Sequence, residues 1–456
     1  KHLIQETTDA EMIRVLEATY PLIGQIDHVS VHPGGIVITP GPLTDVVPVQ
    51  WTTKGYLTTQ YDHHDVEALG LPKIDLLGIR ALTVLADAAE QVRTHYDAAF
   101  RLSDILLDDT PTAEALAEGE TVGVFQCESE GARRTLRKLQ AQNVQNLAIA
   151  NAFFKPGPAT GGMAEAFVQR YRGEAEVSYL HPSLARILGP TKGVLIFQEQ
   201  ILRVATEIAG LSWEQAGHLR RGMSKMNSNE MAQMQAAFKA GCRRDPPAGP
   251  GMTAEQTEQL WAQVKAFSGY GFNQGHATAY ADVSYRSAYV KTHWPAAFFC
   301  ARLQSRGGFH HPAVYMAEAV RLGIDVRTPH VNTSQSRFSL TLEGTRPALR
   351  MGLGQVRDLR RRAISDLIQA RRNGAFEDLR DFLSRVPLRT KEITHLIQCG
   401  ALDGLGPNRP TMLALARQIQ RAGSAYQLSF DFLDHQRPDA DLAQHLAWEK
   451  RVLGYP

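Results

Sequence analysis

The feature that most constrains the fold is the tract from about residue 80 to about residue 305, where apolar side chains recur at helical spacing. Ile201, Val204, Ala205 and Ile208 follow one another at intervals that place them on one face of a helix. Two capping boxes, at residues 212–215 and 253–256, mark helix starts, because a Ser or Thr there is followed three residues later by Gln. We therefore predict a large helical domain over this tract.

Strand patterns lie on either side of this tract. Residues 34–42 contain a β-rich run bracketed by turn formers, and residues 73–76 and 339–342 are two further short strands. Helical patterns return before residue 24 and over residues 351–422, whereas residues 423–456 are polar and predicted to be rich in loops. The predicted fold is mixed α/β and mainly α-helical.

Composition indicates a soluble, multidomain protein, with 43% hydrophobic and 21% charged residues. Apolar runs fall short of the roughly 18 residues that span a bilayer, so we expect no membrane partner. The cysteines are Cys127, Cys242, Cys300 and Cys399, and they lie far apart without paired spacing. This argues against a zinc site or a disulfide framework and favours a cytoplasmic location. The net charge of +2 decides nothing about nucleic acid, because binding depends on where charge gathers.

Lys73 and Asp75 stand two residues apart on a predicted strand, so their side chains share one face. Ile74 and Leu76 are then expected to point into the core. Two interpretations stay open. The pair is either a surface ion pair, worth at most about 1 kcal/mol, or a functional pair whose carboxylate holds a divalent cation while the ammonium meets a phosphate.

Basic residues recur four apart in two predicted helices. Arg221 and Lys225 share a face within a run that also contains Arg220. The other helix carries Arg133, Arg134, Arg137 and Lys138. Like charges at this spacing cost roughly 0.2–0.5 kcal/mol unless an anion lies between them. One cluster is typical of a solvated face, whereas with two clusters a solvated face and a polyanionic partner are equally good interpretations.

Two further segments have a functional and an ordinary interpretation. Residues 267–276 interleave aromatic residues with glycines, which suits close approach to a base or sugar but also a glycine-rich turn with its aromatics in the core. Residues 427–432 read QLSFDF, which suits docking into an apolar pocket of a partner but also arises by chance. Phosphate-loop, zinc-protease, hydrolase and dinucleotide motifs are absent from the sequence.

Taken in order, these segments resemble the bacterial C-family DNA polymerases, the alpha subunits of DNA polymerase III. The similarity to the second half of the palm lies in HPGGIVI (32–38), TQYD (59–62) and KIDLLG (73–78). Further matches are VFQCES (124–129), FKPGP (154–158), FQEQ (197–200) and the runs 219–225 and 269–276. The resemblance covers nearly the entire chain.

That family uses two metal ions, held by three palm aspartates, to add deoxynucleotides to a primer. The resemblance implies that Asp75 is the third of these aspartates and a ligand of Mg²⁺, and that Lys73 touches the incoming dNTP. It implies a nucleotide-facing fingers surface made of Arg220, Arg221, Lys225, Tyr270, Asn273 and His276. We assign the basic cluster of residues 133–138 to primer-template DNA.

Departures from the family are equally informative. The other two palm aspartates and the histidine-rich N-terminal domain of the family have no equivalent in this sequence. The sequence also lacks a starting Met, and it stops where the family continues into a nucleic-acid-binding barrel. We expect a piece of a longer subunit that does not polymerise alone. The resemblance places helix–hairpin–helix segments at residues 352–354 and 400–406. The first is degraded, because residues 357–359 read RDL where a second hairpin glycine is expected, which argues against DNA gripping there.

The sliding clamp and other replisome or translesion subunits are the implied protein partners. The clamp peptide would consist of Gln427, Leu428, Phe430 and Phe432, although its spacing is not the commonest form. The expected domains are the end of the thumb (1–25), palm (26–80), fingers (81–350), a helix–hairpin–helix and clamp module (351–435) and a linker (436–456). The location expected is the cytoplasm, at the nucleoid.

Two alternatives remain. The replicative subunit and its error-prone relatives share these motifs, with a slight preference for the replicative type. The chain could also derive from a polymerase that became a non-catalytic DNA- or clamp-binding protein, although the retention of Lys73, Asp75 and the nucleotide-facing set argues against this.

Overall fold

The computed structural model divides into two compact units, residues 1–79 and residues 80–456. Within them it describes residues 9–25, 30–153, 163–221, 228–267, 272–305, 307–344, 346–422 and 437–455. The mixed α/β, mainly helical fold class is confirmed. None of the described helices is long and apolar enough to cross a membrane.

The smaller unit consists of short elements joined by long loops. Its helices are α2 (Ala10–Thr19) and α3 (His63–Ala68), and its strands are β1 (Gly35–Val37), β2 (Val49–Trp51), β3 (Leu57–Thr59) and β4 (Lys73–Asp75). The strands form two antiparallel pairs, β1 with β4 and β2 with β3. Among its described residues only Val47 and Val66 are buried apolar side chains. Two separate strand pairs cannot enclose a core, so this unit has few buried apolar side chains. The two strands predicted here are confirmed.

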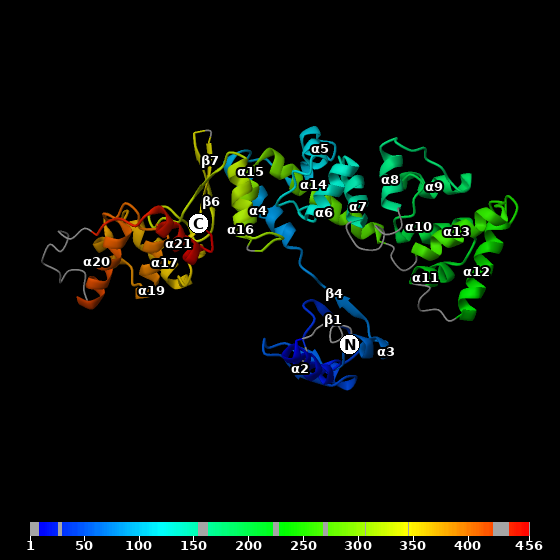
Figure 1. Cartoon of the computed structure of the whole chain (residues 1–456), viewed down its shortest axis with the longest axis horizontal. Coiled ribbons are helices and arrows are strands. Elements are labelled where there is room, and N and C mark those ends of the chain that lie inside the picture. Colours follow the sequence, from blue (N-terminus) through cyan, green and yellow to red (C-terminus); the bar gives the residue numbers. More distant parts are fainter. Residues whose placement is uncertain are drawn as a thin grey trace. The chain divides into compact units, whose positions relative to one another are not determined.

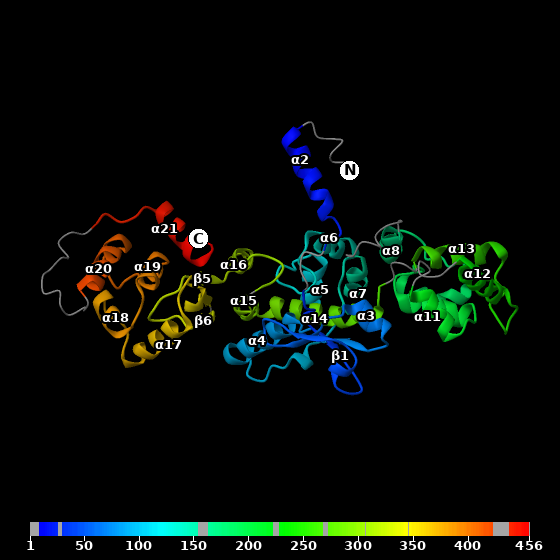
Figure 2. The ribbon, with the colours of Figure 1, turned by 90° about the horizontal axis from the view of Figure 1, so that it is seen from below.

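One group of helices in the larger unit is centred on a long helix, α14. These are α4 (Arg80–His95), α5 (Thr110–Ala117), α6 (Glu130–Leu139), α7 (Val144–Phe153), α8 (Met163–Tyr171), α14 (Gln274–His293), α15 (Pro295–Gln304) and α16 (Pro312–Arg321). The central α14 packs against α4, α5, α7 and α15, and Figure 2 shows α5 and α7 along one side of it. Small and aromatic side chains, including Ala281 and Tyr285, fill this core.

A second apolar core belongs to the helices between α8 and α14 (Figure 1). They are α9 (Ala185–Leu188), α10 (Gln198–Arg203), α11 (Trp213–Arg221), α12 (Ser228–Arg243) and α13 (Ala254–Phe267). Both predicted capping boxes are confirmed: Ser212 and Gln215 exchange hydrogen bonds of 2.9 and 3.1 Å, and Thr253 and Gln256 exchange bonds of 3.0 and 3.2 Å.

The last third contains a small sheet followed by short helices. Strands β5 (Asp325–Arg327), β6 (Ser339–Glu343) and β7 (Arg346–Arg350) lie in the order β5-β7-β6. The helices are α17 (Arg361–Ala370), α18 (Leu379–Arg385), α19 (Thr390–Gln398), α20 (Arg409–Ala422) and α21 (Leu442–Leu453). The sheet contacts α15, and α19 packs against α20 and α21.

The prediction of a loop-rich tail is wrong over residues 442–453, which form α21. Asp441 caps this helix by accepting the Gln444 N–H at 2.8 Å. Only Val452 and Leu453, in its last turn, are buried. Because so little of the helix faces the core, its apolar periodicity is too weak to find in the sequence.

Candidate functional site

Asp75 ends β4 beside an exposed cation. The strand register places Gly35 opposite Asp75 and Val37 opposite Lys73. Lys73 and Asp75 share one face, and Lys73 Nζ lies 2.5 Å from Asp75 Oδ1. Both side chains stay accessible, with 28% of Lys73 and 45% of Asp75 exposed. The pair therefore is not a closed, buried ion pair, and the Asp75 carboxylate can reach a ligand.

Gly34 and Gly35 allow β1 to lie close to the Lys73–Asp75 pair. A Cβ on Gly34 would stand 2.2 Å from a backbone oxygen of the segment after β4, and a Cβ on Gly35 would stand 2.9 Å from both Lys73 and His32. No residue larger than glycine fits at that separation. His32 Nδ1 accepts the Gly34 N–H at 3.2 Å and lies 3.8 Å from Asp75 Oδ1. The paired glycines thus hold His32 and Lys73 around the Asp75 carboxylate.

Neighbouring charge keeps Asp75 ionised. The hydrogen bond from Lys73 lowers the pKa of Asp75 below its ordinary value, and attraction from Lys73 and His32 lowers it further, against a smaller opposing effect of desolvation. An ionised carboxylate is the oxygen donor that hard divalent cations prefer. In the part of the chain that the structure describes, no group of three or more His, Cys, Asp or Glu side chains could hold a metal ion, so Asp75 offers one ligand and not a complete cation site.

The expectation that Ile74 and Leu76 point into the core is wrong. Ile74 is 46% exposed and Leu76 63% exposed. Alternation along a strand fixes only the direction of a side chain, and burial also requires a layer that covers that face. Within the described residues of the smaller unit, α3 contacts β4 but leaves Ile74 and Leu76 exposed.

On the larger unit, two of the predicted nucleotide-facing residues, Asn273 and His276, lie at the start of α14. Asn273 caps this helix: its Oδ1 accepts the His276 N–H at 2.6 Å, and its Nδ2 donates to Glu199 at 2.8 Å. The other carboxylate oxygen of Glu199 accepts the Gln274 N–H at 2.8 Å. Both polar atoms of the Asn273 side-chain amide bond within the protein, so Asn273 positions the start of α14. The His276 side chain is exposed.

An aromatic row continues from this helix start. The ring centroid of His276 lies 5.6 Å from that of Phe272 and 4.0 Å from that of Tyr280, which in turn lies 5.2 Å from Phe125. His276 is exposed and the other three rings are half-buried. Aromatic faces in this state can support a base or a sugar.

The remaining nucleotide residues are described only in part. Arg220 is half-buried in the last turn of α11, while the side chain of Arg221, all of Lys225 and all of Tyr270 lie outside the described residues. The convergence of this set with Asp75 stays a prediction.

The basic cluster of α6 has protein partners of its own. Arg137 pairs with Glu130 at 3.3 Å, Lys138 pairs with Glu165 at 2.7 Å, and Arg133 Nε donates to the Gly119 carbonyl at 2.8 Å. Internal acids therefore relieve part of the like-charge repulsion that the spacing suggested. Arg134, the fourth member, is exposed.

Asp358 lies in the segment where the resemblance predicts a second hairpin glycine, and its backbone adopts a conformation typical of glycine. Its φ is 61°, the left-handed region that glycine enters most easily. An Asp tolerates this conformation better than most residues do, because its short side chain can bond locally. Here its carboxylate lies 3.0 Å from Lys391 Nζ and 3.8 Å from His395 Nδ1.

Glu392 and Glu199 are polar residues whose roles the sequence reading missed. Glu392 is buried and accepts four hydrogen bonds, from the backbone N–H, Nε and Nη2 of Arg360 and from the Arg389 N–H, at 2.7–3.1 Å. It thereby occupies the N-terminal ends of α17 and α19 together. Glu199 had one available signal, its place in the FQEQ motif.

The clamp peptide of residues 427–432 lies outside the described residues.

Comparisons with known proteins agree with the resemblance. Residues 1–78 match the bacterial DNA polymerase III alpha NTPase domain, residues 81–245 the finger domain of the same subunit, and residues 323–412 a helix-hairpin-helix motif. The DNA polymerase III subunit alpha of Pseudomonas fluorescens is 37% identical over 417 residues, covering 88% of this chain and 34% of the relative. Those of Halalkalibacterium halodurans and Bacillus subtilis are 34% and 33% identical, covering 100% and 96% of this chain and 41% and 40% of the relatives.

The class that these matches and the fold define is that of the bacterial C-family DNA polymerases. Within this class, the chain belongs to the family of DNA polymerase III alpha subunits. It spans between a third and about two fifths of the length of the relatives compared.

Proposed function

We propose that this chain is part of a DNA-directed DNA polymerase that transfers nucleotides from dNTPs to a primer 3′-hydroxyl on a DNA template. Membership of the DNA polymerase III alpha family supports this reaction. The observation that carries it to particular residues is the accessible, ionised carboxylate of Asp75, held beside Lys73 and His32 by a pair of glycines.

Asp75 is proposed as one carboxylate ligand of Mg²⁺. The donor chemistry fits, since Asp75 offers oxygen only and Mg²⁺ is typically bound through one or two carboxylates, waters and substrate phosphates. When bound, two such ions would lower the pKa of the primer hydroxyl and neutralise charge on the departing pyrophosphate. Lys73 would then be available to contact a triphosphate oxygen, because the metal would neutralise the Asp75 carboxylate in its place.

The fingers surface is proposed to hold the nucleotide. Arg220, Arg221 and Lys225 would meet its phosphates, because a polyanion relieves the mutual repulsion of cations that lie close together in the sequence. His276 and Tyr270 would face the sugar and base, with Asn273 and Glu199 fixing the helix start that presents them.

The remaining parts of the chain are proposed to hold DNA and protein partners. Residues 26–80 would be palm, 81–350 fingers and 351–435 a helix–hairpin–helix and clamp module, between the end of the thumb (1–25) and a linker (436–456). Exposed Arg134 and its neighbours on α6 would contact primer-template DNA. Residues 427–432 would dock in the sliding clamp, and other replisome or translesion subunits would complete the assembly.

Replacement of Asp75 tests this function. In a polymerase subunit that carries this chain with a complete palm, Asp75→Asn should abolish primer extension and leave primer-template binding largely intact. Asp65→Asn is the matched control, because Asp65 is an exposed acid of the same unit on α3. Near-normal turnover of Asp75→Asn would refute the assignment.

A further inference from the structure

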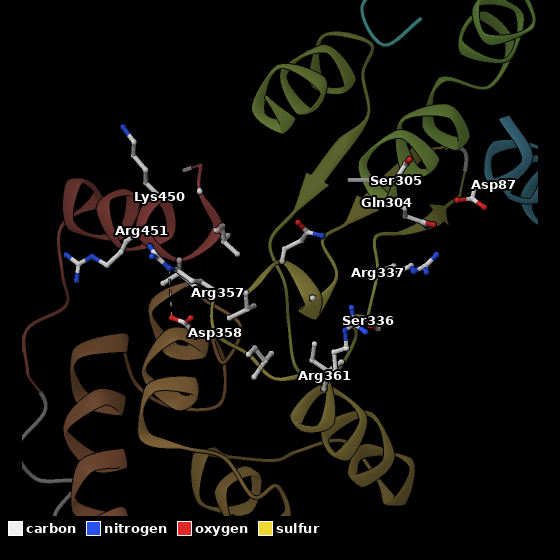
Figure 3. A pocket seen from close by; sticks show the side chains of 18 of the residues that line it. Asp87, Gln304, Ser305, Ser336, Arg337, Arg357, Asp358, Arg361, Lys450 and Arg451 are labelled. Atoms are coloured by element: carbon white, nitrogen blue, oxygen red, sulfur yellow. Dashed lines mark ion pairs between the residues drawn. The ribbon is translucent and has the colours of Figure 1, made fainter. Parts of the chain in front are cut away.

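Two hollows of unlike chemistry lie in the larger unit. The first is a polar cleft of about 1250 Å³, and two of its lining residues, Arg357 and Arg361 (Figure 3), belong to the module already proposed to hold DNA. The second is a groove of about 350 Å³ between α20 and α21. This volume is at the small end of the roughly 300–1,000 Å³ that is typical of ligand sites. None of the residues that line the groove has a role in the proposed polymerase site.

The walls of this groove are mostly apolar. Helix α20 contributes Pro410, Leu413, Ala414 and Arg417, and helix α21 contributes Gln444 and Trp448. The members on α20 recur three or four residues apart, so they share one face of that helix. From the first to the last of them the helix axis rises about 10 Å, which matches about three residues of extended chain. The groove therefore fits a short extended peptide with an apolar anchor.

Two exposed arginines, Arg417 and Arg437, supply the positive charge of the groove. The backbone of Arg437 is fixed at the start of α20, because its N–H donates to Thr411 Oγ1 at 3.0 Å and its carbonyl accepts from Asn408 Nδ2 at 2.7 Å. From Thr411 to Arg417 the axis of α20 rises about 9 Å. The two cations therefore reach the groove near opposite ends of its α20 wall.

Neither arginine is neutralised within the described part of the chain, where no acid forms an ion pair with Arg417 or Arg437. Neighbouring Arg409 provides the contrast, because it is buried and pairs with Asp403 at 2.7 Å and with Glu449 at 2.9 Å. A planar guanidinium group binds a carboxylate through two parallel hydrogen bonds. Two guanidinium groups without an acid therefore favour a ligand that brings its own anionic groups.

We propose that this groove binds a short acidic peptide of a partner protein, with an apolar anchor between two carboxylates. The apolar wall takes the anchor, Arg417 and Arg437 each meet a carboxylate, and the side-chain amide of Gln444 offers a donor and an acceptor to the peptide backbone. A nucleic-acid strand fits less well, because it carries a phosphate on every nucleotide and would leave one against Leu413 and Ala414 without a counter-charge. A mononucleotide carries its charge at one end and would meet only one of the two arginines.

Charge reversal on the 456-residue chain tests the proposal. The probes are two fluorescein-labelled peptides, Gly-Glu-Asp-Leu-Phe-Asp-Glu-Gly and its basic counterpart Gly-Lys-Arg-Leu-Phe-Arg-Lys-Gly, and their Kd values are measured by anisotropy. The variant Arg417→Glu/Arg437→Glu should weaken binding of the acidic peptide about tenfold and tighten binding of the basic peptide, because each exposed ion pair contributes up to about fivefold. The control Arg243→Glu/Arg372→Glu reverses two exposed charges outside the groove and should leave both Kd values unchanged.

Two further measurements test the apolar anchor and the place of binding. An acidic peptide in which Ser-Ser replaces Leu-Phe should bind about tenfold more weakly, because burial of a large apolar side chain contributes at least this factor. Hydroxyl-radical footprinting of the unmutated chain covers the case of a misfolded variant. The acidic peptide should protect Trp448 and not Trp213, which is 70% exposed on another helix.

Several results would overturn the proposal. An unchanged Kd for the acidic peptide in Arg417→Glu/Arg437→Glu, or an equal change in the control variant, would exclude the two arginines as its ligands. Displacement of the acidic peptide by oligo-dT or by deoxyadenosine monophosphate at lower concentration than by unlabelled peptide would assign the groove to a nucleic acid or a nucleotide. Tighter binding after replacement of residues 427–432 by Gly and Ser would assign it to a segment of this chain, and an unprotected Trp448 would exclude the groove.

Discussion

Replacement of Glu392 offers a quantitative test of the region that joins α17 to α19. Its carboxylate is 2% exposed and accepts four hydrogen bonds from Arg360 and Arg389. The hydrogen bonds from the Arg360 guanidinium, more than the backbone N–H groups, lower the pKa of Glu392 to about 2. Against an ordinary value near 4.5, this corresponds to about 3 kcal/mol, reduced to about 2–3 kcal/mol because the Arg360 side chain is 38% exposed and partly screened.

The perturbation is Glu392→Gln, which keeps the size of the side chain and removes its charge. Hydrogen exchange at pH 7, read on peptides from α17 and α19, should report a loss of about 2–3 kcal/mol in local stability. Glu377→Gln, an exposed acid between the same two helices, is the control and should change exchange little. Wild-type protection in Glu392→Gln would refute the reasoning.

The same group predicts a pH dependence with a defined sign. A carboxylate whose pKa is lowered by folding stabilises the protein above its unfolded pKa, and this contribution is lost as the pH falls through the folded pKa. The difference in local stability between wild type and Glu392→Gln should therefore be constant above about pH 5 and shrink between about pH 4.5 and pH 2. A difference that grows as the pH falls would contradict the assignment.

Two further predictions concern the proposed nucleotide and clamp sites in a subunit that carries this chain. Glu199→Gln should raise the KM for dNTP several-fold with a smaller change in kcat, because the start of α14 loses an anionic acceptor. Glu199→Asp should partly restore the wild-type KM. Equal KM values for wild type and Glu199→Gln in steady-state primer extension would exclude this positioning role. Phe430→Ala/Phe432→Ala should abolish binding to immobilised sliding clamp. The control Phe309→Ala removes a ring elsewhere that is 65% exposed and should not affect this binding. Retained binding in the double variant would exclude residues 427–432 as the clamp-binding peptide.

The sequence was most informative where local chemistry sets the structure. The capping boxes at Ser212 and Thr253 and the strand containing Asp75 were predicted because each depends on residues only a few positions apart. The helical character of residues 80–305 followed from periodicity in the same way.

What sequence reasoning missed depends on contacts between distant segments. Ile74 was expected in the core, because alternation gives a direction but does not reveal whether another layer covers that face. Glu199 reaches Asn273 across more than seventy residues, and the partner of Lys138 is Glu165 on another helix. Such pairs form only when the tertiary fold brings the segments together, and no spacing in a single sequence encodes them.

The central claim is that Asp75 and the fingers cations hold one metal-bound triphosphate. A double-mutant cycle of Asp75→Asn and Arg220→Ala tests it most directly, with the Kd of the incoming nucleotide measured on a dideoxy-terminated primer-template in the presence of Mg²⁺. If both side chains hold the same triphosphate, the two losses in binding free energy will differ from additivity by more than about 0.5 kcal/mol. Strictly additive losses, or an unchanged Kd in either single variant, would contradict the account.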